Sequence, residues 1–266
     1  MKKITFTIMF LCVLFCFQSI CYSQCGGFCQ DDKVIKEHCK IQKKVLIVVT
    51  SHNLLGKTGK PTGYYLPEVT HPYFKLIDSG FNVDIASIKG GKAPMDESSR
   101  DLKDPLNFRF LVDPEHDRKL QQTLKLSSMK ASDYNALIFA GGHGTMWDFP
   151  DNKDVLRLAA EIYENGGIIA AVCHGPAALV NIKLSNGNYL VAGKKVTAFS
   201  NDEEDAAKLS KVMPFMLETE LIKRGAVFEK APLWKSRVVA DDRLVTGQNP
   251  ASASELGKVI ADLLKK

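Results

Sequence analysis

The sequence lacks a strong charge of either sign. Its 35 Lys and Arg residues, set against 30 Asp and Glu residues, give a formal net charge of +5 over 266 residues. Lys2 and Lys3 contribute two of these charges, and the rest of the chain contains no dense basic stripe. Proteins that bind nucleic acid or anionic membrane surfaces through charge concentrate basic residues on one face. The composition therefore argues against both classes of partner.

Cysteine is nearly absent beyond the N-terminal part of the chain. Six of the seven cysteines lie within the first 39 residues, and Cys173 is the exception. Cys25, Cys29 and Cys39 are irregularly spaced and lack the second CxxC pair of a structural zinc site, so a metal site fits poorly there. In an exported protein, two of these three thiols could form one disulfide.

The N-terminus has the three-part pattern of a secretory signal peptide. Two lysines follow the first methionine, residues 4–17 form a nearly unbroken apolar run, and small and polar residues come next. We expect cleavage after Ser23, so that residues 1–23 are a signal peptide and residues 24–42 a polar, cysteine-containing leader. The apolar run is too short for a stable membrane anchor, and lipid attachment at Cys21 is disfavoured by the bulky residue before it. The pattern predicts a periplasmic or secreted protein.

Strand and helix patterns alternate through residues 43–266. Unbroken apolar runs, typical of strands buried on both faces, are separated by helical segments. Strands are expected at residues 44–50, 82–88, 136–142, 168–172 and 195–199, with a hairpin or strand at 238–246. Helices are expected at residues 67–77, 152–165, 203–224 and 251–264. This alternation predicts an α/β fold with one flavodoxin-like domain, a doubly wound parallel sheet sandwiched by helices. Residues 89–130 break the rhythm and predict a small helical cap insertion.

The segment around Cys173 has the form of a nucleophile elbow. Ala171-x-Cys173-x-Gly175 places small residues two positions either side of a thiol, directly after a buried strand. Ligands bind at the carboxyl ends of the strands in such sheets, so the strand ends near Thr50, Gly141-Gly142, Cys173 and Phe199 should converge on one site. A following helix would favour the thiolate through its dipole. The alternative is an inert buried cysteine at the end of a core strand.

A cysteine nucleophile needs a base and a site for the developing negative charge. His174 and His143 are the candidate bases. No histidine follows position 174, which argues against a papain-like or amidotransferase-like triad, whose histidine lies further downstream of the cysteine. Glu68, in the first turn of an expected helix, could share the proton of the thiol or could be an ordinary solvated carboxylate. Gly141 and Gly142 could supply half of an oxyanion hole or form only a tight turn.

Several ordered motifs carry a family resemblance that runs from about Lys44 to the C-terminus. They are Gly63-Tyr64-x-x-Pro67-Glu68-x-x-His71-Pro72, Gly90-Gly91-Lys92-Ala93-Pro94-x-Asp96, Gly141-Gly142-His143-Gly144-Thr145-Met146-Trp147-Asp148, Ala171-Val172-Cys173-His174-Gly175-Pro176-Ala177 and Thr246-Gly247-Gln248-Asn249-Pro250-Ala251-Ser252. Together they resemble the ThiJ/PfpI superfamily, which has a class I glutamine amidotransferase-like fold. The branch they resemble most is that of the glutathione-independent glyoxalase III proteins, also described as chaperone-like proteins or protein deglycases.

The resemblance implies roles for individual residues. Cys173 matches the family nucleophile, Glu68 the acid that handles its proton, and His174 the second member of the catalytic set. Glu204 matches the acid that orients the histidine, with Asp202 or Glu203 as alternatives if the loop is offset. The implied substrate and oxyanion residues are Gly141, Gly142, His143 and Trp147, with backbone N–H groups of Gly142 and His174 as the oxyanion donors; Trp147 has core packing as its alternative. The resemblance implies no required metal or cofactor, and it implies a homodimer.

The activity implied is conversion of methylglyoxal, or a similar small 2-oxoaldehyde, to D-lactate through a hemithioacetal on Cys173. A protein deglycase would use the same thiol addition. A holdase chaperone would instead use exposed apolar surface in the insertion at residues 89–130, and a redox sensor would use oxidation of Cys173. A cysteine peptidase ranks last, because adjacent cysteine and histidine residues usually diverge.

Overall fold

The structure of the chain is a computed structural model that describes residues 43–266. The expected signal peptide at residues 1–23 and the leader at residues 24–42 lie outside the described residues, as do Cys25, Cys29 and Cys39. None of the helices in the described part is long and apolar enough to cross a membrane.

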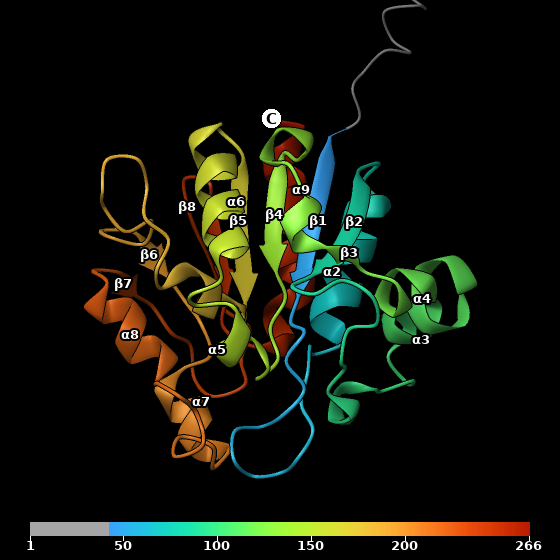
Figure 1. Cartoon of the computed structure of the whole chain (residues 1–266), viewed down its shortest axis with the longest axis horizontal. Coiled ribbons are helices and arrows are strands. Elements are labelled where there is room, and N and C mark those ends of the chain that lie inside the picture. Colours follow the sequence, from blue (N-terminus) through green and yellow to red (C-terminus); the bar gives the residue numbers. More distant parts are fainter. Residues whose placement is uncertain (1–42) are drawn as a thin grey trace, which may run out of the picture. The chain divides into compact units, whose positions relative to one another are not determined.

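The centre of the fold is a seven-stranded sheet with the strand order β3-β2-β1-β4-β5-β9-β8 (Figure 1). Six strands run parallel, and β8 pairs antiparallel with β9 at one edge. The strands are β1 (Lys44–Val49), β2 (Asn82–Ser87), β3 (Leu124–Lys125), β4 (Ala136–Phe139), β5 (Ile168–Val172), β8 (Val238–Asp241) and β9 (Leu244–Gly247). Every residue of β4 and β5 is buried, as their unbroken apolar sequences require. The predicted doubly wound parallel sheet and the terminal hairpin are confirmed.

Helices cover both faces of this sheet. On one face, α2 (Pro67–Ile77) and α9 (Ala253–Lys265) pack against each other, and on the other face α6 (Lys153–Glu164) lies over β4 and β5 (Figure 1). Successive residues of β1 enter opposite layers: Leu46 joins the core beneath α6, and Ile47 the core beneath α2 and α9. This two-residue period gives the sheet an apolar layer on each side.

The predicted helical insertion at residues 89–130 contains two short α-helices, α3 (Pro105–Val112) and α4 (Pro114–Gln121). Both begin with an aspartate whose side chain accepts backbone N–H groups of the first turn, followed by a proline that suits that turn. The sequence analysis missed β3, which follows α4 and adds an edge strand to β2. Its two residues are too few for a sequence pattern to reveal.

Two expected elements are wrong. The helix at residues 203–224 is instead α7 (Asn201–Ala206) and α8 (Leu217–Lys223), because Lys208 has a positive φ of 60° and Pro214 interrupts the segment between them. The strand at residues 195–199 is only β6 (Lys195–Val196), which pairs with β7 (Val227–Phe228) in a separate two-stranded sheet. Phe199 nevertheless reaches the end of β5, because its N–H donates to the carbonyl of Cys173 at 2.8 Å.

Candidate active site

Cys173 occupies a strained turn at the carboxyl end of β5. Its φ is +59°, a left-handed conformation that costs a non-glycine residue about 1–3 kcal/mol. The turn is held by a hydrogen bond from the Cys173 N–H to the carbonyl of Gly247 at 2.9 Å. A Cβ atom on Gly175 would lie 2.2 Å from the carbonyl oxygen of Phe139, so only glycine fits two residues after the thiol. The strained turn and this close approach are the features of a nucleophile elbow.

The helix expected after the elbow is present as a 3-10 helix, Gly175–Leu179, with His174 as its N-cap residue. Burial, followed by the neighbouring charge of Glu68, raises the pKa of Cys173 well above its ordinary value. Burial and the Glu68 charge therefore outweigh any helix dipole that favours the thiolate.

Glu68 reaches the thiol from the first turn of α2 and is wholly buried. Its Oε2 accepts the N–H of Gly141 at 2.8 Å, and the carboxyl group lies beside the Cys173 thiol. Its Oε1 is buried without a hydrogen-bond partner. Burial raises the pKa of Glu68 to about 8, although the contacts with Cys173 and Gly141 lower it. Since two negative charges cannot be held together here, the pair keeps at least one proton in common.

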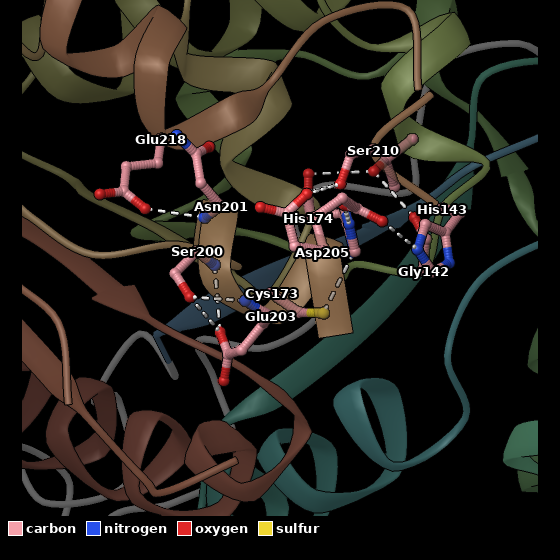
Figure 2. Close-up of polar contacts among 12 residues, drawn as sticks. Gly142, His143, Cys173, His174, Ser200, Asn201, Glu203, Asp205, Ser210 and Glu218 are labelled. Carbon is pink, nitrogen blue, oxygen red and sulfur yellow. Dashed lines mark hydrogen bonds and ion pairs between the residues drawn. The ribbon is translucent and has the colours of Figure 1, made fainter. Parts of the chain in front are cut away.

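His174 links the thiol to Glu204. Its Nδ1 lies 3.3 Å from the Cys173 Sγ (Figure 2). Its Nε2 lies 2.7 Å from the Glu204 Oε2. Burial, together with the neighbouring His143, lowers the pKa of His174 to about 4. Burial alone would raise the pKa of Glu204, but hydrogen bonds from His143 and His174 lower it to about 2. The arrangement is a neutral imidazole oriented by a carboxylate, as acid-base catalysis at a thiol requires.

His143 is the second partner of Glu204. Its Nε2 lies 3.2 Å from the Glu204 Oε1. Its ring lies beside that of His174 (Figure 2), with centroids 4.1 Å apart. The two imidazoles thus share one carboxylate. Among the described residues, His143, His174 and Glu204 form the one group of histidine, cysteine or acidic side chains whose ligand atoms lie close enough, within 4.8 Å, to hold a metal ion.

The alternatives to Glu204 are engaged elsewhere. Glu203 is fully buried and closes a capping box with Ser200, accepting its N–H at 3.0 Å (Figure 2). Its other oxygen accepts the N–H of Trp234 at 3.0 Å and the amide of Asn249 at 2.8 Å. Asp202 forms an exposed ion pair with a lysine. Of the three neighbouring acids, only Glu204 contacts His174.

Trp234 and Asn249 are site-forming residues that the sequence analysis missed. The Trp234 ring packs against Phe199 at 5.7 Å between centroids, and Phe199 in turn packs against His174 at 4.3 Å. Asn249 could have been found from the sequence, because it belongs to one of the motifs that carry the family resemblance. Trp234 lies in an irregular segment outside these motifs, and no sequence pattern indicates it.

The glycine pair at the end of β4 lies beside the elbow. A Cβ atom on Gly141 would lie 2.5 Å from the Glu68 Oε2 and 2.8 Å from the backbone nitrogen of His174. Gly142 has a φ of +98°, and a Cβ atom there would lie 2.3 Å from the carbonyl oxygen of Gly63. The Thr145 hydroxyl, in α5 (Thr145–Asp148), lies within hydrogen-bond distance of the carbonyls of Gly142 and His174, at 2.9 and 3.0 Å, and shares its one hydrogen between them. The structure therefore brings the glycine pair and the backbone of His174 together beside the thiol, and their role as an oxyanion site stays a prediction.

Trp147 lies apart from this cluster. Its ring stacks on His52 with centroids 5.0 Å apart, and no ring contact with His174 occurs within residues 43–266. A role for Trp147 in substrate binding stays a prediction.

Comparison of the sequence with known proteins identifies its family. The pattern of the DJ-1/PfpI family matches residues 62–263. The chain belongs to the DJ-1/PfpI family. It is 37% identical over 236 residues to the glutathione-independent glyoxalase HSP31 of Saccharomyces cerevisiae, covering 84% of this chain and 98% of that protein. It is 32% identical over 226 residues to glyoxalase 3 of Candida albicans, covering 79% and 93%.

Solved structures agree with this assignment. The Rapid Encystment Protein of 24 kDa from Francisella tularensis is 43% identical with a TM-score of 0.82, over 84% of this chain and 99% of that one. The glyoxalase III structure from Candida albicans is 30% identical with a TM-score of 0.76, over 83% and 96%. The resemblance to the ThiJ/PfpI superfamily, and to its glyoxalase branch, is confirmed.

Proposed function

We propose that this chain is a glutathione-independent glyoxalase that converts methylglyoxal, or a similar small 2-oxoaldehyde, to the 2-hydroxy acid D-lactate. Curated relatives with 30–37% identity over most of the chain carry the name glutathione-independent glyoxalase or glyoxalase 3. The observation that carries the proposal is the contact between Glu68, a fully buried acid, and the Cys173 thiol. A thiol that only sensed oxidants would have no need of a buried acid to move a proton between carbons.

The first step adds the thiol across the aldehyde. Cys173 Sγ bonds to the aldehyde carbon as its proton passes to His174 Nδ1, 3.3 Å away. The carbonyl oxygen gains negative charge, accepts hydrogen bonds from the N–H groups of Gly142 and His174, and then takes up the proton. Each such donor is worth roughly 3 kcal/mol in comparable sites. The product is a neutral hemithioacetal, and no outside reactant has been used.

The second step moves a proton between two carbons. The Glu68 carboxylate removes the hydrogen from the hemithioacetal carbon to give an enediol, and the proton is returned to the neighbouring carbon. Its pKa of about 8 lies close to neutral pH, which is where a general acid-base group is most effective. The resulting thioester on Cys173 is hydrolysed by water, which releases the hydroxy acid and restores the thiol.

The test is turnover without glutathione. Loss of methylglyoxal and formation of D-lactate should be measured for the unmodified protein, Cys173→Ser, Glu68→Gln and the exposed control Glu164→Gln. We expect no turnover with Cys173→Ser, a loss of roughly 10²- to 10⁴-fold with Glu68→Gln, and no change with the control. Lack of turnover in the reduced, unmodified protein would refute the proposal.

A holdase activity is a second candidate because the insertion exposes apolar side chains. Leu102, Phe108 and Val112 are each at least half exposed, and the last two lie one turn apart on α3. Suppression of client aggregation should then survive Cys173→Ala and weaken with Phe108→Ser. A deglycase would share the thiol addition, and glycated peptide substrates would separate it from the glyoxalase.

We further propose that the chain is exported and works as a homodimer. Export is supported by the signal-peptide pattern, and the dimer by the family resemblance. N-terminal sequencing of protein recovered outside the cytoplasm should begin near Gln24, and light scattering should give twice the mass of that mature chain.

A further inference from the structure

The two imidazoles around Glu204 have the donor set of a transition-metal site. His143 and His174 each direct Nε2 at a different oxygen of one carboxylate, at 3.2 and 2.7 Å. All three ligand positions lie within 4.8 Å of one another. Imidazole and carboxylate ligands suit Zn²⁺ and its neighbours in the first transition series. Two histidines and one glutamate also leave a fourth tetrahedral position for water.

The distances are close to those that a bound ion needs. Ligand atoms about 2.0–2.1 Å from a tetrahedral Zn²⁺ lie roughly 3.3 Å from each other. The contact of His143 with Glu204 already has this separation, and the contact of His174 with Glu204 would need to widen by about half an ångström. His143 is partly exposed while His174 and Glu204 are buried, so an ion would enter from the His143 side.

We propose that His143, His174 and Glu204 form a Zn²⁺ site that reversibly switches the enzyme off. No part of the family assignment implies this ion. Cys173 is not a ligand, because its Sγ lies at Nδ1 of His174, on the opposite edge of the ring from Nε2. The inhibitory consequence rests on the proposed glyoxalase function, whereas binding of the ion does not.

Inhibition follows from the position of one proton. A neutral imidazole has a single N–H. In the metal-free site the proton lies on Nε2 of His174 and is donated to Glu204, which leaves Nδ1 free to accept the thiol proton. When Zn²⁺ occupies Nε2, the proton must lie on Nδ1, where it faces Sγ. The ring then has no lone pair for the thiol proton, and addition to the aldehyde stops.

The binding test needs no turnover. Zn²⁺ is titrated calorimetrically into the full chain with its six N-terminal cysteines replaced by serine, which removes every thiol except Cys173. In this background we expect one Zn²⁺ per chain, unchanged affinity with Cys173→Ser, and binding at least tenfold weaker with His143→Asn. The matched control is His52→Asn, which changes a histidine outside the cluster and should bind normally. Unchanged affinity with His143→Asn, or loss of binding with Cys173→Ser, would overturn the proposal.

The inhibition test uses methylglyoxal turnover in the same background with Cys173 intact. Activity should fall as the calorimetric site fills and return on addition of a chelator. Full activity with the site occupied would overturn the switch. Absence of activity before any zinc is added would instead count against the glyoxalase proposal, and the two failures are thereby distinguished. Substitution of Co²⁺ for Zn²⁺ should give a visible spectrum without a thiolate charge-transfer band, since the thiol is not a ligand.

Discussion

Replacement of Glu68 by glutamine should stabilise the protein while lowering its activity roughly 10²- to 10⁴-fold. Glu68 is wholly buried, and burial raises its pKa from 4.5 to about 8. The folded state therefore holds this proton more tightly than the unfolded state does. As the pH rises from 4.5 to 8, the unfolded chain ionises first, and the free energy of unfolding falls. Glutamine has nearly the same shape, keeps an oxygen for the N–H of Gly141, and carries no charge at any pH.

The size of this stabilisation follows from the shift in the pKa of Glu68. Each unit is worth about 1.4 kcal/mol, so the 3.5 units between 4.5 and 8 correspond to about 5 kcal/mol once the group is fully ionised. The advantage of Glu68→Gln should be about 1 kcal/mol at pH 5.5, about 3 kcal/mol at pH 7 and nearly 5 kcal/mol at pH 8.5. For a domain of this size, 3 kcal/mol corresponds to an increase in Tm of roughly 6–12 °C.

Urea unfolding at these three pH values is the assay. The proteins with and without Glu68→Gln should both carry Cys173→Ser, which removes the titration of the neighbouring thiol, and other groups cancel in the difference. Glu164→Gln is the control of opposite sign: hydrogen bonds from Ser185 lower the pKa of Glu164, so that substitution should cost stability at high pH. If the advantage of Glu68→Gln at pH 8.5 is no larger than its advantage at pH 5.5, the reasoning is refuted.

Three further substitutions test how the site is held. Gly142→Ala should lower the free energy of unfolding, measured with urea, by about 4 kcal/mol, and its control Gly187→Ala by about 1 kcal/mol. Both glycines have positive φ, but only at Gly142 does a backbone oxygen lie within 2.3 Å of the new Cβ atom. Glu203→Gln turns one buried acceptor into a donor, and thermal unfolding should show a loss of about 3 kcal/mol. Glu204→Gln should lower kcat roughly 10²- to 10⁴-fold with an unchanged circular dichroism spectrum, because the active-site imidazole loses its orientation; unchanged kcat would contradict this.

The sheet was predictable because its central strands are buried on both faces. β1, β4 and β5 are unbroken apolar runs, and such runs have few alternatives in an alternating α/β chain. The region after residue 195 was less predictable. There the chain forms short elements, such as β6 and α7, whose ends depend on tertiary contacts rather than on sequence period.

The partner of His174 was decidable from the sequence in retrospect. Ser200 and Glu203 have the spacing of a capping box, in which the side chain of the third helical residue accepts the backbone N–H of the N-cap residue. The capping box engages the side chain of Glu203 at the start of the helix. Glu204, one position further along the helix, is therefore the acid that faces the imidazole of His174. The same spacing predicts α7 to begin after Ser200, as it does.

The protonation state of Cys173 could not be predicted, for a quantitative reason. A helix dipole stabilises a nearby anion by about 0.3–1 kcal/mol, and by about 2 kcal/mol in favourable cases. Burial of an ionised group can shift its pKa by several units, each worth about 1.4 kcal/mol, and so outweighs the dipole. The elbow motif indicates the helix dipole. It does not indicate the burial of the thiol, because burial depends on Glu68, Phe199 and other residues distant in the chain. The raised pKa therefore favours the protonated thiol in the resting site, and in the mechanism that we propose the thiol ionises as its proton passes to His174.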